Sequence, residues 1–198
     1  MSRVTTNTTP AQRRILDAAV DAFAEHGFGG TATRDIATRA GRSPAAVYIH
    51  YETKEELLFA ISLGGHQAAL ACLRGALESS DDPVCRIAEA IRSFSLWHME
   101  NAKLGRIVQY ELHALSPAHR AQIDELRRQI NGLLVGALRA GVSTGDFEID
   151  DLESAARALL SMCIDFVRWF DPAIAKDRHL TARRYADLAR HMLRSRAR

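Results

Sequence analysis

The sequence is poor in the residues that would indicate metal or redox chemistry. Its 198 residues include only three cysteines, which are Cys72, Cys85 and Cys163. None of them belongs to a C-x-x-C pair or stands at ligand spacing from a histidine, and the separations between the histidines are not those of a metal site. We therefore expect no metal and no cofactor. We interpret the cysteines as small buried hydrophobic residues in a reducing cytoplasm.

Long hydrophobic runs and the common catalytic motifs are also missing. No run reaches the ~18 uncharged apolar residues of a membrane span, and the first residues, MSRVTTNTTPAQRR, lack the apolar segment of a secretory signal. We expect a cytoplasmic protein without a membrane segment. No G-x-S-x-G, phosphate-binding P-loop or H-E-x-x-H motif occurs, which disfavours an enzyme. Serine, cysteine, histidine and aspartate are nevertheless available for a nucleophilic site, so composition alone does not exclude one.

Strand signals are almost absent, whereas helix signals recur along the chain. In TPAQRRILDAAVDAFAEHGF, Thr9 and Gln12 form a capping box, Pro10 takes the first helical position and Gly27 ends the helix. Similar punctuation, including Thr33 and Asp150 as N-caps, predicts about nine helices and an all-α protein. The other helices are expected at about residues 33–40, 44–51, 53–77, 83–101, 102–115, 117–141, 150–170 and 181–198.

The segment RSPAAVYIHYETKEEL, residues 42–57, crowds two tyrosines and a histidine onto a short helix. A second short helix precedes it, with Gly41 in the turn, and the pair has the pattern of a helix-turn-helix motif. In that motif the second helix enters the major groove with its N-terminal end first. We expect Tyr51 to face the core of a small N-terminal domain. The expected donors to DNA phosphates are Tyr48, His50 and Lys54.

The longer segment TATRDIATRAGRSPAAVYIHYETKEELL resembles the DNA-binding segment of TetR-family transcriptional repressors over about residues 10–60. The elements that carry the resemblance are Thr33, Ile36-Ala37, Gly41, Tyr48, His50-Tyr51 and Lys54-Glu55-Glu56-Leu57. The resemblance implies a three-helix DNA reader at residues 1–56 and a helical effector-binding and dimerisation domain at residues 57–198. The implied partners are double-stranded operator DNA, a small-molecule effector, and a second copy bound through the last two helices.

The resemblance also indicates which residues contact DNA. Thr33 and Tyr48 stand where family members contact phosphate, and His50 and Lys54 stand where they often do. The residues that approach base edges are expected to be Arg42, Ser43, Pro44, Ala45 and Ala46. Because the alanines cannot form hydrogen bonds, direct readout would depend on Arg42, Ser43 and Arg34. Residues 1–56 carry seven basic and seven acidic side chains, so we expect modest non-specific affinity for DNA.

The second domain is rich in residues suited to an apolar pocket with a few polar groups. The candidate effector-binding residues are Phe94, Trp97, His98, Arg106, Tyr110, His113, Met162, Phe166, Arg168 and Trp169. Ordinary core packing is the alternative for each of them. The VRWFDP segment resembles the corresponding segment of TetR-family members that sense acyl-CoA thioesters, which favours an anionic, partly apolar effector at Arg168. The alternative for Arg168 is an ion pair with Asp165 or Asp171.

The last two predicted helices carry more apolar surface than one helix pair needs, and we expect a four-helix dimer interface there. Its predicted residues are Leu159, Cys163, Phe166, Val167, Leu188, Met192 and Leu193. Residues 176–198 carry eight basic and two acidic side chains, which suits a solvated helix end or an acidic partner. The predicted function is a ligand-responsive repressor. The alternative is a helical lipid- or acyl-CoA-binding protein with a degenerate DNA reader.

Overall fold

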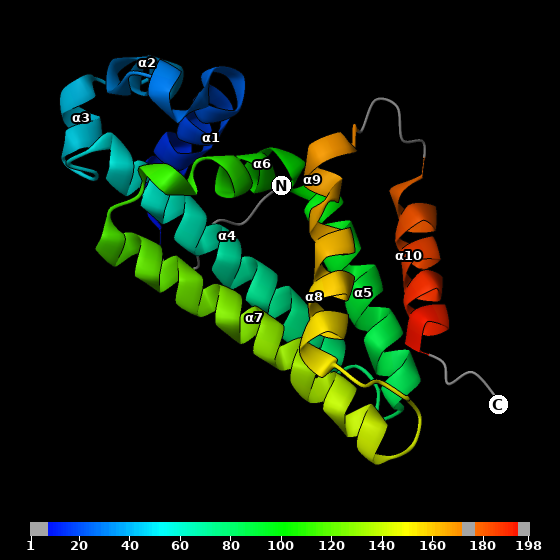
Figure 1. The fold of residues 1–198 in the computed structure, drawn as a ribbon. Coiled ribbons are helices and arrows are strands. Elements are labelled where there is room, and N and C mark those ends of the chain that lie inside the picture. The colour runs from blue at the N-terminus through cyan, green and yellow to red at the C-terminus, as the bar shows by residue number, and fades with distance from the viewer. Residues whose placement is uncertain (1–7, 172–176, 194–198) are drawn as a thin grey trace. The chain divides into compact units, whose positions relative to one another are not determined.

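The computed structural model describes residues 8–171 and 177–193, and these residues form helices joined by short turns, with no strand among them (Figure 1). The α-helices are α1 Pro10–Gly30, α2 Thr33–Arg39, α3 Pro44–Tyr48, α4 Lys54–Leu77, α5 Pro83–Glu100, α6 Ala102–Tyr110, α7 Pro117–Ser143, α8 Leu152–Ile164, α9 Phe166–Trp169 and α10 Arg178–Leu193, and η1 Leu112–Ala114 is a short 3₁₀ helix. The all-α prediction is confirmed. Two predicted helices are each divided in the structure, one into α6 and η1 and the other into α8 and α9.

Several helices begin where the sequence predicts, and the predicted caps make the expected hydrogen bonds. The Gln12 N–H donates to Thr9 Oγ1 at 3.2 Å, and the Thr9 N–H donates to Gln12 Oε1 at 2.9 Å. The Ser43 hydroxyl accepts from an N–H of α3 at 3.2 Å. The Asp82 carboxylate accepts from an N–H of α5 at 2.6 Å. These groups satisfy amide donors that a helix start leaves unpaired.

Two other helices begin one residue away from the predicted start, and α10 begins three residues before it. Thr33 is the first residue of α2 rather than its cap. The start of α2 is stabilised instead by the Asp35 carboxylate, which accepts a hydrogen bond from the Ala32 N–H at 3.1 Å. Asp151 rather than Asp150 caps α8, accepting from the Ser154 N–H at 3.0 Å. At α10 the Asp177 carboxylate accepts from an N–H of the first turn at 2.8 Å. Several residues near a helix start can accept a hydrogen bond from its first amides. Their order along the chain does not show which of them does so.

The chain forms two compact units, which are described separately. The first unit consists of residues Met1–Ala68 and Lys103–Glu125, and the second consists of Ala69–Ala102 and Leu126–Arg198. Both α4 and α7 therefore contribute residues to each unit. The first unit contains the predicted DNA reader, but it extends beyond residue 56 and also includes α6. A division at residue 56 accordingly cuts through one compact unit.

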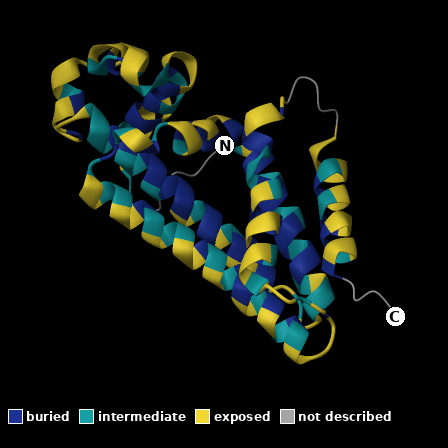
Figure 2. Ribbon diagram, viewed as in Figure 1, coloured by how far each residue is buried: buried dark blue, intermediate teal, exposed yellow. Residues whose placement is uncertain are grey.

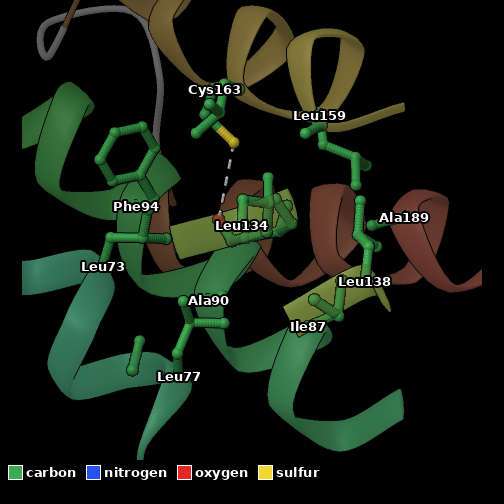
Figure 3. Close-up of a cluster of buried hydrophobic side chains, with 14 of the residues drawn as sticks. Leu73, Leu77, Ile87, Ala90, Phe94, Leu134, Leu138, Leu159, Cys163 and Ala189 are labelled. Carbon is green, nitrogen blue, oxygen red and sulfur yellow. Dashed lines mark hydrogen bonds between the residues drawn. The ribbon is translucent and has the colours of Figure 1, made fainter. Parts of the chain in front are cut away.

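The core of the second unit forms where α4, α5, α7, α8 and α10 converge (Figure 3). Figure 3 shows Leu73 of α4, Phe94 of α5, Leu134 of α7 and Cys163 of α8 directed into this core. The Cys163 thiol accepts a hydrogen bond from Ser95 at 3.2 Å, and burial raises its pKa to about 12. Cys163 thus fits the interpretation of a small buried residue.

The two other cysteines do not share this environment. Cys72 is half-buried, and burial together with nearby acidic groups raises the pKa of its thiol to about 11. Cys85 is exposed in the first turn of α5, so the prediction that all three cysteines are buried is wrong for Cys85.

One described helix, α4, is long and apolar enough by composition to cross a membrane. Over half of its most apolar window, 56%, is buried inside the protein. Leu57, Leu58 and Ile61 have no exposed surface in the first unit, and Leu73 has none in the second. The apolar character of α4 is therefore used in packing within the protein (Figure 2).

Candidate DNA-binding and effector-binding sites

The two short helices α2 and α3 are joined by a tight turn in the first unit. Gly41 adopts a φ of 64° in this turn, a left-handed conformation that glycine accepts at no steric cost. The Gly41 N–H donates to Thr38 O at 3.1 Å, and the Arg42 N–H donates to Ala37 O at 2.9 Å. These bonds close the end of α2. The turn thereby fixes the direction in which α3 leaves it.

The buried side of α3 is very narrow. Val47 is its only fully buried residue, and like Ile36 and Ala37 of α2 it has no exposed surface. Tyr51 follows α3, is 9% exposed, and has its pKa raised by burial. The prediction that Tyr51 faces the core is confirmed. The rest of the short helix is left open to solvent.

The open side of α3 carries the predicted DNA-contacting residues (Figure 2). Exposed residues in the turn and on this side of the helix are Arg42, Ser43, Pro44, Ala45, Tyr48, Ile49 and His50, while Ala46 is half-buried. Tyr48 is 49% exposed. Arg34 on α2 is also exposed, with its guanidinium 3.7 Å from the Asp35 carboxylate, and Thr33 is half-buried. All of these residues belong to the first unit.

Ile49 was missed by the sequence analysis. It is 80% exposed, which makes it the most exposed large hydrophobic residue in the described part of the chain. A signal was available, because the buried face of so short a helix is fixed by Val47, and a residue two positions away lies on the other side. Apolar side chains of this kind contact thymine methyl groups where a protein reads the major groove.

Lys54, which is predicted to contact a phosphate, makes contacts within the first unit in the structure. Its ammonium donates to Phe28 O at 2.6 Å and to Thr31 O at 2.8 Å. The same nitrogen lies 4.3 Å from the centroid of the Phe28 ring. The two carbonyls stand where α1 ends, just past a kink at Gly27. Lys54 is thus engaged within the first unit as a cap for α1.

Glu111 contacts the same α1–α2 junction and was also missed. Its carboxylate accepts from the Phe28 N–H at 3.2 Å, across 83 residues of sequence. Gly27 has a φ of 69°, and a Cβ there would stand 3.3 Å from the Glu111 carboxylate. The Thr31 hydroxyl completes the junction by donating to the Gly27 carbonyl at 2.8 Å. The junction is therefore held by one cation and one anion, each from a distant part of the chain.

A second long-range contact joins the starts of α4 and α7 within the first unit. The Glu55 carboxylate accepts from the Ser116 N–H at 2.7 Å and lies 2.9 Å from His119 Nδ1. The His119 ring stacks on Phe59 with centroids 3.8 Å apart. Burial raises the pKa of Glu55, but the hydrogen bonds from Ser116 and His119 outweigh burial and leave it below its ordinary value.

The ten predicted effector-binding residues are divided between the two units. The first unit contains Arg106, Tyr110 and His113, all exposed, and the His113 ring nitrogen lies 2.9 Å from Tyr110 O. The second unit contains Phe94, Trp97, His98, Met162, Phe166, Arg168 and Trp169.

Core packing accounts for the most buried of the second group. Phe94 and Phe166 are 1% and 0% exposed. The Phe94 ring centroid lies 4.4 Å from that of His98, and the Phe166 centroid lies 4.4 Å from that of Tyr185, a residue the sequence analysis did not select. Trp97 and Met162 pack against the core from half-buried positions. These residues match the core-packing alternative.

Arg168 and Trp169 lie at the surface of the second unit. The Arg168 guanidinium donates to both carboxylate oxygens of Asp165, at 2.8 and 3.1 Å. This bond holds the pKa of Asp165 below its usual range. The ion-pair alternative for Arg168 is therefore the arrangement found. Trp169 is 49% exposed.

A buried polar pair on α4 was not selected either. Ser62 and His66, one turn apart in the first unit, are 0% and 7% exposed. The His66 ring lies 2.8 Å from Ser62 O. The Ser62 hydroxyl has no hydrogen-bond partner within residues 8–171 and 177–193. Polar residues within an otherwise apolar helix were the signal that could have identified them.

Comparisons with known proteins agree with this arrangement. Residues 15–61 match the family described as "Bacterial regulatory proteins, tetR family", and residues 80–193 match "Tetracyclin repressor-like, C-terminal domain". The HTH-type transcriptional repressor KstR2 of Rhodococcus jostii is 28% identical over 188 residues, which cover 93% of this chain and 91% of that protein.

Two solved structures extend the likeness to the whole fold. A bacterial regulatory protein in the tetR family from Rhodococcus RHA1 is 40% identical, with a TM-score of 0.90 over 96% of this chain and 100% of that one. AibR in complex with isovaleryl coenzyme A and operator DNA is 26% identical, with a TM-score of 0.80 over 92% of this chain and 97% of that one.

Proposed function

Because the chain belongs to the TetR family of transcriptional regulators, we propose that it is a repressor that binds a palindromic operator as a homodimer. We further propose that a small, largely apolar effector of the acyl-CoA type releases it from DNA. The observation that carries the proposal is the open side of α3, which places Tyr48, Ile49 and His50 at the surface next to the exposed turn at Arg42.

The proposed contacts divide into two kinds. Tyr48, His50 and Thr33 position the protein on phosphates, which carry no sequence information. Arg42 reads a base edge, with Ser43, Pro44, Ala45, Ala46 and Arg34 around it. Arg42 is exposed and has no ion-pair partner in the part of the chain that the structure describes. A guanidinium placed in this way suits the bidentate acceptor pair of a guanine in the major groove.

One similar protein supports the effector class. AibR was solved with isovaleryl coenzyme A and operator DNA together. Similarity in fold and sequence to AibR favours a ligand that combines an apolar acyl group with a charged carrier, and similarity to KstR2, which is named as a transcriptional repressor, favours the repressor role. The exposed residues Arg106, Tyr110 and His113 of the first unit remain candidate polar contacts for such a ligand.

The proposed homodimer uses the last two helical segments, but only Leu188 and Met192 of the seven residues predicted for it. Five of the seven predicted interface residues lie in the protein's own core at 4% exposure or less, and these are Leu159, Cys163, Phe166, Val167 and Leu193. The exposed hydrophobic residues there are Trp169, Leu180, Leu188 and Met192, at 49%, 38%, 52% and 56%. The three on α10 are spaced by multiples of four, so they form one stripe along the helix. We propose this stripe as the apolar centre of the interface.

The alternative function is a helical lipid- or acyl-CoA-binding protein with a degenerate DNA reader. The match of residues 15–61 to the tetR family of bacterial regulatory proteins disfavours it, because that segment carries the elements of the DNA reader. An enzyme is not expected in a family of regulators. A regulator of this kind acts on chromosomal DNA, so we propose a cytoplasmic location.

The test is a measurement, by fluorescence anisotropy at two salt concentrations, of binding to DNA from upstream of the protein's own gene. Random DNA serves as the control. We expect the upstream DNA to bind at least ~10³-fold more tightly than random DNA. Addition of isovaleryl coenzyme A or a longer acyl-CoA should then release it, whereas the free fatty acid should not. Equal affinity for upstream and random DNA, together with acyl-CoA binding, would instead establish the alternative.

A further inference from the structure

A polar groove lies on the second unit between α7 and α8. Its volume is about 550 Å³, and its lining residues are Arg127, Arg128, Asn131, Gly132, Glu153 and Arg157. No apolar side chain is among them. The lining includes three arginines and one glutamate, which amounts to two net positive charges at neutral pH. Arg157 also interacts electrostatically with Asp151, which is not part of the lining.

The single carboxylate of the groove is already engaged. The Asn131 side-chain amide donates to Glu153 Oε2 at 2.7 Å, which joins α7 to α8 across the groove. The same bond keeps the two walls of the groove in register.

The floor of the groove is opened by a glycine in the middle of a long helix. Gly132 is exposed, and a Cβ built on it would meet no atom within 4 Å. Glycine destabilises a helix interior relative to alanine, and no neighbouring atom at this position is close enough to require it. What Gly132 provides is open space between the arginines of α7 and Arg157 of α8.

We propose that this groove binds a phosphate-ester anion, and that in the proposed function it binds the phosphate groups of a coenzyme A-type effector. Guanidinium groups pair with phosphate oxygens through two parallel hydrogen bonds, and arginine is favoured where such pairing is needed. Only the identity of the effector rests on the proposed function, since a free phosphorylated metabolite would present the same anion.

Titration calorimetry of the full chain with coenzyme A, 3′-dephospho-coenzyme A, pyrophosphate and pantetheine tests the groove directly. We expect the phosphorylated probes to bind and pantetheine not to bind. Arg157→Gln and Arg128→Gln should each weaken coenzyme A binding about tenfold or more. Glu153→Gln should tighten it, because the variant removes a negative charge from the groove. Arg139→Gln is the matched control, since Arg139 is an exposed arginine of α7 outside the groove.

A pair of glycines gives a second test that does not alter charge. Gly132 and Gly136 are both exposed on α7 with open space above them, but only Gly132 lines the groove. Leucine at either position should raise the melting temperature by about 2–4 °C, because both replace a helix-interior glycine. Only Gly132→Leu should weaken coenzyme A binding.

The outcomes separate this inference from the proposed function. If acyl-CoA released operator DNA equally well from the parent protein and from the Arg128→Gln, Arg157→Gln double variant, the groove inference would be wrong and the proposed function would stand. If pyrophosphate bound to the groove but no acyl-CoA released DNA, the groove would serve a free phosphorylated metabolite and the proposed effector would be wrong. Equal losses in Arg139→Gln would show only general attraction of anions, and would overturn the inference.

Discussion

Replacing Lys54 by methionine tests whether this residue stabilises the α1–α2 junction or binds a DNA phosphate. Its ammonium donates to Phe28 O and Thr31 O at 2.6 and 2.8 Å and lies 4.3 Å from the Phe28 ring centroid. Methionine keeps most of the aliphatic stem but removes the charge and every donor. The substitution therefore removes the polar contacts with little loss of packing.

The expected cost follows from these contacts. A hydrogen bond from a charged donor contributes ~1.5–3 kcal/mol, and a cation over an aromatic ring contributes ~0.5–1 kcal/mol at exposed sites. Lys54 is half-buried, so water recovers part of the loss at each carbonyl. We expect Lys54→Met to lower the free energy of unfolding by about 2–3 kcal/mol. In a chain of this size that corresponds to a fall of about 5–10 °C in melting temperature.

Two measurements on the same variant distinguish the roles. Thermal unfolding reports the junction, and the slope of log affinity for operator DNA against log salt concentration reports phosphate contacts. Loss of one phosphate contact to a charged group reduces that slope by ~0.9. We expect a large fall in melting temperature and an unchanged slope.

The matched control is Lys103→Met. Lys103 is 3.0 Å from Asp21, with 69% and 44% of the two side chains exposed, and surface pairs of this kind contribute ~0–1 kcal/mol. The opposite result would be a melting temperature within a degree of the parent protein and a salt slope of log affinity reduced by about one. That result would refute the stabilising role of Lys54 and support the phosphate contact.

Three further substitutions test the DNA, pH and dimer proposals. Arg42→Ala should lose ~1–3 kcal/mol of operator affinity with little change on random DNA, measured by anisotropy; equal losses on both DNAs would make Arg42 a phosphate contact. The pKa of Glu55 lies below its ordinary value of 4.5, so its stabilising contribution is present above pH 4.5 and is lost as the pH falls below that value. Glu55→Gln should therefore flatten the acid side of a urea-stability profile, and an unchanged acid profile would contradict this. Leu188→Glu with Met192→Glu should produce a folded monomer by light scattering, whereas a persistent dimer would place the interface elsewhere.

Features set by neighbouring residues were predictable from the sequence. The Thr9 and Ser43 caps form hydrogen bonds within three residues of themselves, and such bonds depend on little beyond the local backbone. The turn at Gly41 is similar, because a left-handed φ strongly favours glycine. The inward direction of Tyr51 followed from the buried face of one short helix.

Contacts between distant segments could not be predicted in the same way. Glu111 binds an N–H 83 residues away, and Lys54 binds carbonyls 23 and 26 residues away. Neither contact leaves a pattern in the residues around it. The family resemblance suggested a phosphate contact for Lys54, because similarity in sequence aligns positions without saying what surrounds each side chain. Only the fold shows that the carbonyls of Phe28 and Thr31, just past the kink at Gly27, lie within reach of its ammonium.

The dimer interface shows a related limit of hydrophobic patterns. Helical periodicity identifies the apolar face of a segment, but it does not say whether that face meets the same chain or another copy. Leu159 and Cys163 of α8 pack into the core that α5 and α7 share, so they have no exposed surface left for a partner. The apolar residues that remain after internal packing are the informative ones. On α10 those residues are Leu188 and Met192, each more than half exposed, and burying such a stripe is what a second copy would provide.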